Sequence, residues 1–191
     1  DCSFTGAGVA NGNSSYFVTA QSQAWQGFLR VLADPAVRKV THDAKPVYNA
    51  CQNCGHEFAG LTFDSMLAAY LLNPSGNEYK IERLVNDFTS IVSVAAPPKK
   101  EDDTDYLVWA AECLPEIYRV QRQDLDRIGA SDLLADIELP LIKVLSLMEQ
   151  YGVQVDSTGL ERMDREIAKR IQLLLQTIYE SAGESFNVNS T

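Results

Sequence analysis

The feature that most constrains this chain is a long stripe of apolar side chains near its end. Its members recur at intervals of three and four residues: Leu160, Met163, Ile167, Ile171, Leu174 and Ile178. That spacing places all of them on one face of a helix. The pattern Thr158-x-x-Glu161 resembles a capping box and predicts where the helix begins. The stripe stands isolated at the end of the chain, and the whole segment from residue 105 to the end is expected to be helical.

A second helix is expected just before this one. Pro140 suits a first helical turn, and Gly152 is a suitable stop. Apolar residues between them predict a buried face made of Leu141, Val144 or Leu145, and Met148.

The first half of the chain alternates short strands and helices. Strands are expected at 4–10 and 16–19 around the turn Asn11-Gly12-Asn13, and again at 37–41 and 61–63. Helices are expected at 22–33, from Asp43 to about Cys54, from Asp64 to 72, and at 80–88, with Asp43 and Asp64 as N-caps. Residues 94–104, with two prolines and a charge run, predict an exposed loop. This order is typical of an α/β protein.

The length, the apolar runs and the cysteine content narrow the class of protein further. A length of 191 residues suits one core, or one domain with a helical extension. No apolar run reaches the roughly 18 to 20 residues of a membrane span, and no signal peptide opens the chain, so a soluble cytoplasmic protein without a membrane partner is expected. Four cysteines argue against a disulfide scaffold and are compatible with a reducing compartment.

The net charge of −10 is unevenly distributed. Residues 1–100 hold eight acidic and eight basic side chains, whereas residues 101–191 hold eighteen acidic and eight basic ones. A surface that binds the phosphates of DNA is normally basic. By charge alone the chain is therefore a poor DNA-binding candidate.

Several segments share the order and spacing of one known family. The matching residues near the end are Glu138, Pro140, Gly152, Val153, Asp156, Ala182, Gly183, Phe186, Asn187 and Ser190. The segments Lys39–Lys45 and Gly60–Pro74 match upstream. In these segments the chain resembles family A polymerases of the bacterial DNA polymerase I type, at the place where the 3′-to-5′ exonuclease domain joins the thumb of the polymerase domain.

The resemblance implies a fold and a domain division. The fold is an α/β, ribonuclease-H-like (DnaQ-like) 3′-to-5′ exonuclease fold, followed by long helices of the thumb. Residues 1–136 would form the exonuclease-like domain, and 137–191 would start the polymerase domain with a linking helix and the first thumb helix. The family's opening strand is expected to precede residue 1, so that the domain is N-terminally truncated.

The same resemblance locates an exonuclease site whose metal ligands are missing. Two divalent cations about 4 Å apart require several anionic oxygens, which the family supplies from three motifs. Here Ser3 stands in place of the first motif's glutamate, and Val47 in place of the second motif's aspartate. In the third motif Trp109 replaces tyrosine, and Cys113, a soft ligand unsuited to magnesium, replaces aspartate. The implied domain is therefore degenerate, without catalytic residues, metal ligands or proofreading activity.

Two alternatives stay open. Asp43, four residues before Val47, could serve as a displaced ligand of an active magnesium-dependent exonuclease. Cys51 and Cys54 could belong to a zinc-dependent interaction module, although the only histidines are His42 and His56. Buried small residues on one helix face are the simpler interpretation of the cysteine pair.

The remaining expectations follow from the resemblance to the parent polymerase. The parent would act in DNA replication and repair and would use magnesium, whereas this fragment lacks the catalytic aspartates of the palm and needs no cofactor. DNA would be reached through the full-length polymerase, with the rest of the polymerase domain as a partner in cis and the protein a monomer. The residues implied to meet the DNA backbone are Asn187, Asn189, Ser190 and Thr191.

Overall fold

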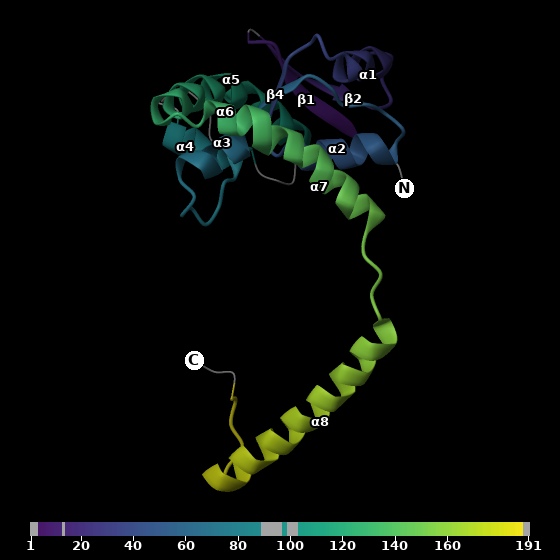
Figure 1. The fold of residues 1–191 in the computed structure, drawn as a ribbon, viewed down its shortest axis with the longest axis vertical. Coiled ribbons are helices and arrows are strands. Elements are labelled where there is room, and N and C mark those ends of the chain that lie inside the picture. Colours follow the sequence, from purple (N-terminus) through teal and green to yellow (C-terminus); the bar gives the residue numbers. More distant parts are fainter. Residues whose placement is uncertain (1–3, 13, 89–96, 99–102, 189–191) are drawn as a thin grey trace. The chain divides into compact units, whose positions relative to one another are not determined.

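The structure, a computed structural model, describes residues 4–12, 14–88, 97–98 and 103–188 (Figure 1). The chain divides into two compact units, Asp1–Tyr151 and Gly152–Thr191, called here the first and second units. The expected exposed loop at 94–104 falls largely outside the described residues. Within the described residues, no helix is both long and apolar enough to cross a lipid bilayer.

The first unit contains two pairs of strands. Strands β1 (Gly6–Ala10) and β2 (Ser15–Thr19) form the predicted antiparallel hairpin, with Gly6 opposite Thr19. Strands β3 (Lys39–Thr41) and β4 (Leu61–Asp64) are parallel, with Thr41 opposite Asp64. Helix α2 connects β3 to β4, as parallel strands require. The predicted strand positions are therefore confirmed to within a few residues.

Seven helices and a π-helical segment belong to the described part of the first unit (Figure 1). They are α1 (Trp25–Ala33), α2 (Ala44–Asn53), α3 (Ser65–Leu72), α4 (Ile81–Phe88), α5 (Asp103–Ile128), α6 (Ser131–Leu133), the π-helical segment η1 (Leu134–Glu138) and α7 (Leu139–Tyr151). Helix α5 packs along β1 and β2, and α7 packs on α2. The predicted α/β organisation is thus confirmed.

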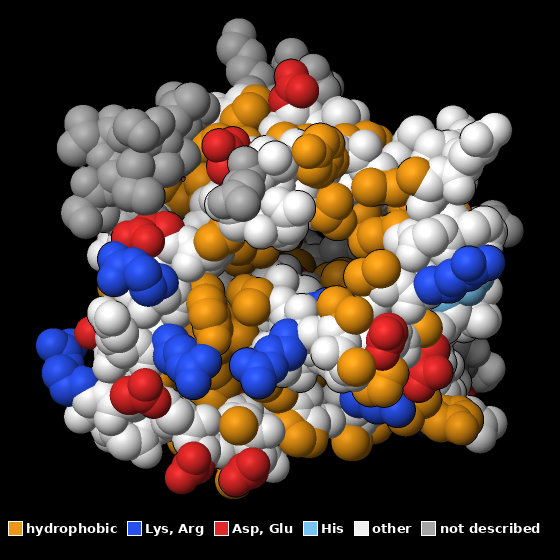
Figure 2. Space-filling view, turned by 90° about the horizontal axis from the view of Figure 1, so that it is seen from above, with side chains coloured by type: hydrophobic (Ala, Val, Ile, Leu, Met, Phe, Trp, Pro, Cys, Tyr) orange, Lys and Arg blue, Asp and Glu red, His pale blue; other side chains and the backbone are white. Residues whose placement is uncertain are grey.

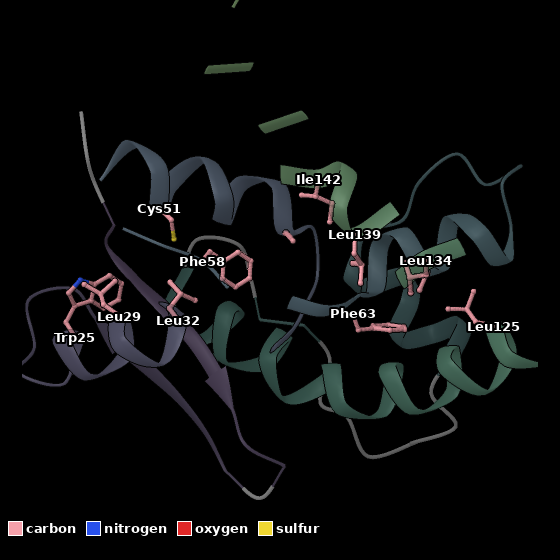
Figure 3. Close-up of a cluster of buried hydrophobic side chains, with 12 residues drawn as sticks. Trp25, Leu29, Leu32, Cys51, Phe58, Phe63, Leu125, Leu134, Leu139 and Ile142 are labelled. Carbon is pink, nitrogen blue, oxygen red and sulfur yellow. The ribbon is translucent and has the colours of Figure 1, made fainter. Parts of the chain in front are cut away.

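Two clusters of buried side chains form the core. The first joins α1, α2, β4 and α7 through residues that include Trp25, Cys51, Phe63 and Ile142 (Figure 3). The second lies between α3, α4 and α5 and includes Ala69, Leu84, Trp109 and Ile117. Each helix contributes the apolar positions that recur every three or four residues, so one face of the helix is removed from water.

The buried face predicted for α7 is wrong. Leu139, Ile142 and Ser146 are buried, whereas Leu141 and Met148 are 40% and 62% exposed. Apolar residues occupy more than one face of this helix. Packing on α2 selects the face that carries Ser146, because the Ser146 hydroxyl donates a hydrogen bond to Asn49 Oδ1 at 2.5 Å.

The second unit consists chiefly of helix α8 (Ser157–Ala182), which contains the predicted apolar stripe and has no buried residue. The capping box predicted at Thr158 is wrong. Asp156 is the N-cap, since its Oδ1 accepts a hydrogen bond from the backbone N–H of Gly159 at 2.9 Å. Gly183, at φ 75°, ends the helix in the left-handed region that glycine adopts readily.

Candidate functional site

The carboxyl ends of β3 and β4 converge on one buried carboxylate. Asp64 is fully buried, and its Oδ1 accepts hydrogen bonds from the backbone N–H groups of Met66 and Leu67 at 2.9 and 3.1 Å. Its Oδ2 accepts one from the backbone N–H of Ala44 at 2.6 Å. Asp64 therefore caps two helices, α3 and α2, and its charge lies at the positive ends of both helix dipoles. The prediction that Asp64 is a helix cap is confirmed.

Asp43 does not cap α2 with its side chain, contrary to the prediction. It occupies the N-cap position with φ 55° and makes no side-chain capping hydrogen bond. A φ in the left-handed region is uncommon for a residue other than glycine, although aspartate tolerates it better than most. Burial, and then the nearby charge of Asp64, raise the pKa of the Asp43 carboxyl. The cap on α2 comes instead from Asp64, twenty residues away.

A chain of polar contacts surrounds this double cap. His42 Nδ1 lies 2.9 Å from the Ser65 hydroxyl, and Gln121 Nε2 donates to the Ser65 carbonyl at 3.1 Å. Ser65 and Gln121 are fully buried. Burial lowers the pKa of His42, although the charges of Asp64, Asp43 and Glu82 oppose this shift. No local pattern predicted a role for Gln121, because its partner is 56 residues away.

Val47 belongs to an apolar stripe on α2. Ala44, Val47 and Cys51 follow one another at intervals of three and four residues, and all three pack in the first cluster. Ala44 and Cys51 are each only 1% exposed. A carboxylate at position 47 would be placed in this apolar surrounding, at a large cost in desolvation. Valine at this position is therefore core packing.

Trp109 and Cys113 lie one helical turn apart on α5 and pack in the second cluster, with exposures of 6% and 2%. The Trp109 ring lies 5.7 Å from the ring of Tyr106. Burial, together with the charge of Glu112, raises the pKa of the Cys113 thiol to about 11. At neutral pH Cys113 is therefore a protonated thiol, which is neither a nucleophile nor a metal ligand.

Glu82 is an acidic residue that no sequence motif predicted. It lies on α4, close to Tyr106 of α5. Burial, and then a hydrogen bond to the Glu82 carboxylate, together raise the pKa of Tyr106 to about 12. The helical periodicity of residues 80–88 predicted the helix but not this contact, which depends on how α4 meets α5.

The side chains at the described positions of the expected ligands pack in the apolar core. Val47 packs in the first cluster, whereas Trp109 and Cys113 pack in the second, and Ser3 lies outside the described residues. Among residues 4–12, 14–88, 97–98 and 103–188, no three His, Cys, Asp or Glu side chains are grouped so that they could hold a metal ion. Valine, tryptophan and a thiol do not fit magnesium, which prefers oxygen ligands.

The cysteines do not form the zinc module considered above. Cys51 is a buried free thiol whose pKa is raised to about 11 by burial, and Cys54 is disulfide-bonded. A zinc site would require both Cys51 and Cys54 to be thiolates, and neither residue is a thiolate here.

Of the residues implied to meet DNA, only Asn187 falls within the described part of the chain. It is exposed and follows Phe186, whose ring packs edge-on against Tyr179 of α8 at a centroid distance of 5.8 Å. Asn189, Ser190 and Thr191 lie outside the described residues.

Comparison with known proteins places this arrangement in a family. The family model described as "DNA polymerase I, ribonuclease H-like domain" matches residues 1–94. The DNA polymerase I of Bacillus caldotenax is 31% identical over 100% of this chain. The chain belongs to the bacterial DNA polymerase I family. DNA polymerase I of Geobacillus stearothermophilus is 30% identical over 97% of the chain. The chain spans 23% and 22% of these two relatives.

Solved structures agree with the assignment. The POL domain of Pol1 from M. smegmatis, in complex with DNA primer-template and dNTP, is similar over 95% of this chain and 31% of its own length, with a TM-score of 0.74 and 25% identity. Brucella melitensis NrnC shares the fold, with a TM-score of 0.56 and 13% identity over 78% of each chain. The first unit of this DNA polymerase I relative is therefore a ribonuclease-H-like, exonuclease-type α/β domain with following helices.

Proposed function

We propose that this chain is a region of a DNA polymerase I that acts in DNA replication and repair in the cytoplasm. Its exonuclease-like domain serves as a structural platform for the polymerase domain and does not proofread. The observation that carries this proposal is the packing of Val47, Trp109 and Cys113 as core side chains in two separate clusters. A two-metal mechanism needs carboxylates that converge on one open site.

The partners of the chain follow from this proposal. DNA is bound by the full-length, monomeric polymerase, and magnesium serves the polymerase site rather than this region. In that polymerase, the residues proposed to bind the DNA backbone are Asn187, Asn189, Ser190 and Thr191. The apolar stripe of α8 supports a partner in cis, since Leu160, Ile167 and Ile171 are each more than half exposed. An exposed apolar face of this length is normally covered by another segment.

The surface of the first unit is consistent with a domain that does not hold DNA by itself. Figure 2 shows one face on which Lys and Arg side chains lie singly or in small groups among acidic and apolar ones. Several of the basic groups are engaged locally; for example, Arg119 forms an ion pair with Glu116 at 2.6 Å. Local pairs of this kind reduce the positive field that phosphates would meet.

The proposal is tested by incubating the purified chain with a labelled single-stranded oligonucleotide and either magnesium or manganese. We expect no metal-dependent release of nucleotides. The Asp43→Ala variant is the matched control, because Asp43 is the residue that could substitute for the missing ligand. Metal-dependent release that disappears in Asp43→Ala would establish the alternative, an active exonuclease with displaced ligands.

A further inference from the structure

Helices α2 and α7 meet along a row of polar side chains, although their partners lie about 100 positions apart in the chain. Lys45 Nζ and Asn49 Nδ2 donate to the two carboxylate oxygens of Glu149, at 2.6 and 3.0 Å. Asn49 Oδ1 accepts from the Ser146 hydroxyl, and Gln150 Nε2 donates to Asn53 Oδ1 at 3.2 Å. These residues, Lys45, Asn49, Asn53, Ser146, Glu149 and Gln150, are called here the polar row.

The row uses a face of α2 that the core does not use. Lys45, Asn49 and Asn53 recur every four residues, as side chains on one face of a helix do. Val47 lies two residues from both Lys45 and Asn49 and therefore points to the opposite side, into the first cluster. Helix α2 thus packs in the first cluster with one face and makes polar contacts with the second half of α7 through the other.

The two halves of α7 are held differently. In the first half, Leu139 and Ile142 are buried in the first cluster, where they lie near Phe63 (Figure 3). In the second half, Met148 and Tyr151 are 62% and 87% exposed, and the buried residue is Ser146, which belongs to the polar row. The first half is therefore anchored by apolar burial, and the second half by polar contacts with α2.

The exposed contacts of the row are readily exchanged for water, whereas the Ser146 side chain is fully buried. The Lys45 and Glu149 side chains are 40% and 49% exposed, so each finds water as soon as the pair separates. Leu139 and Ile142 cannot form hydrogen bonds with water in this way, and their transfer from the core to water is unfavourable. Opening of the second half alone is thus the least costly local motion of this helix.

We propose that the polar row is a latch, which lets the second half of α7 open from α2 and close on it while the first half stays anchored. The chain continues from Tyr151 into Gly152–Asp156, so the latch determines whether the last residues of the first unit are held against α2. This inference rests on the proposed function of the first unit as a structural platform. It adds that the second half of α7 can detach from this platform and return to it.

Hydrogen–deuterium exchange of the backbone amides in the purified chain tests the latch. In a variant that combines Asn49→Ala and Glu149→Ala, we expect amides of residues 147–151 to exchange about tenfold faster, and those of α2 and of the first half of α7 to keep their rates. Lys143→Ala is the matched control, since Lys143 is an exposed residue of α7 outside the row. It should leave all rates unchanged.

Ionic strength gives a second measurement on the unmodified chain, independent of how any variant folds. Salt screens the exposed Lys45–Glu149 pair, so exchange at 147–151 should rise with salt in the natural chain and respond less in Glu149→Gln. Unchanged rates, or faster exchange spread over the whole of α7, would overturn the latch. Neither result affects the nucleotide-release assay, so the latch and the proposed function can fail separately.

Discussion

At the scale of single residues, Asp64 is the side chain on which the first unit most depends. Three hydrogen bonds of 2.6–3.1 Å from the N-termini of α2 and α3 satisfy its buried carboxylate. A buried charge is tolerated only when such donors replace water. Asp64 therefore fixes the two helices relative to the ends of β3 and β4.

Replacing this residue should be costly. We expect Asp64→Ala to lower the free energy of unfolding by about 3 kcal/mol, because two helices lose a cap and buried N–H groups lose their acceptor. Thermal or urea unfolding of the purified variant measures the loss. Asp132→Ala, at an exposed position of α6, is the control and should change stability by less than about 0.5 kcal/mol. Equal effects of the two changes would contradict the double cap.

His42 makes stability depend on pH in a defined direction. Burial lowers its pKa below the ordinary value of 6.5, so the unfolded chain takes up a proton at a higher pH than the folded chain. The contribution of neutral His42 is complete above about pH 6.5 and is lost as the pH falls through its lower folded pKa. In urea unfolding between pH 7.5 and 5, the natural chain should lose more stability than His42→Gln. A constant difference between the two proteins would argue against a buried neutral histidine.

At the scale of elements, the hairpin and α5 approach each other unusually closely. A Cβ built on Gly8 of β1 would lie 2.2 Å from the backbone carbonyl oxygen of Leu107 in α5. These are backbone atoms of a helix, which cannot move aside as the end of a flexible side chain can. The glycine is therefore required by the packing of the strand against the helix.

Two glycine substitutions form a matched pair. Gly8→Ala should destabilise the chain by about 1–3 kcal/mol, since strand and helix must move apart. Gly27→Ala, on α1, has open space around its added Cβ and should be neutral or stabilise the helix by up to about 1 kcal/mol. Urea unfolding of both variants measures the difference. Similar effects at the two positions would show that β1 and α5 are not in close contact.

The elements also show how far the sequence could predict this structure. The strands, most of the helices and the cap at Asp64 follow from local patterns, and all are present. The predictions of the cap on α2 and of the buried face of α7 were wrong. The cap comes from Asp64, which is twenty residues from Ala44 in the chain, and the buried face is set by the contact of Ser146 with Asn49, 97 residues away. Such contacts depend on packing between elements, which periodicity within a segment does not report.

At the scale of the whole molecule, the same distinction applies to the site. The residue types at positions 47, 109 and 113 already indicated that magnesium ligands are missing. What the sequence could not give is where these side chains go, namely into two separate apolar clusters. Val47, Trp109 and Cys113 thus contribute to the apolar packing of the first unit. This supports a platform role within a polymerase, and it leaves α8 with an apolar stripe for a partner segment.

Titration of the purified chain with manganese, followed by the electron paramagnetic resonance of the free ion, tests whether the first unit holds a two-metal site. Manganese replaces magnesium in oxygen-ligand sites, and its free signal falls when it binds. The account predicts that the signal of the free ion grows in proportion to the manganese added, equally for the natural chain and for Asp43→Ala. Two manganese ions bound per natural chain, and lost in Asp43→Ala, would contradict it.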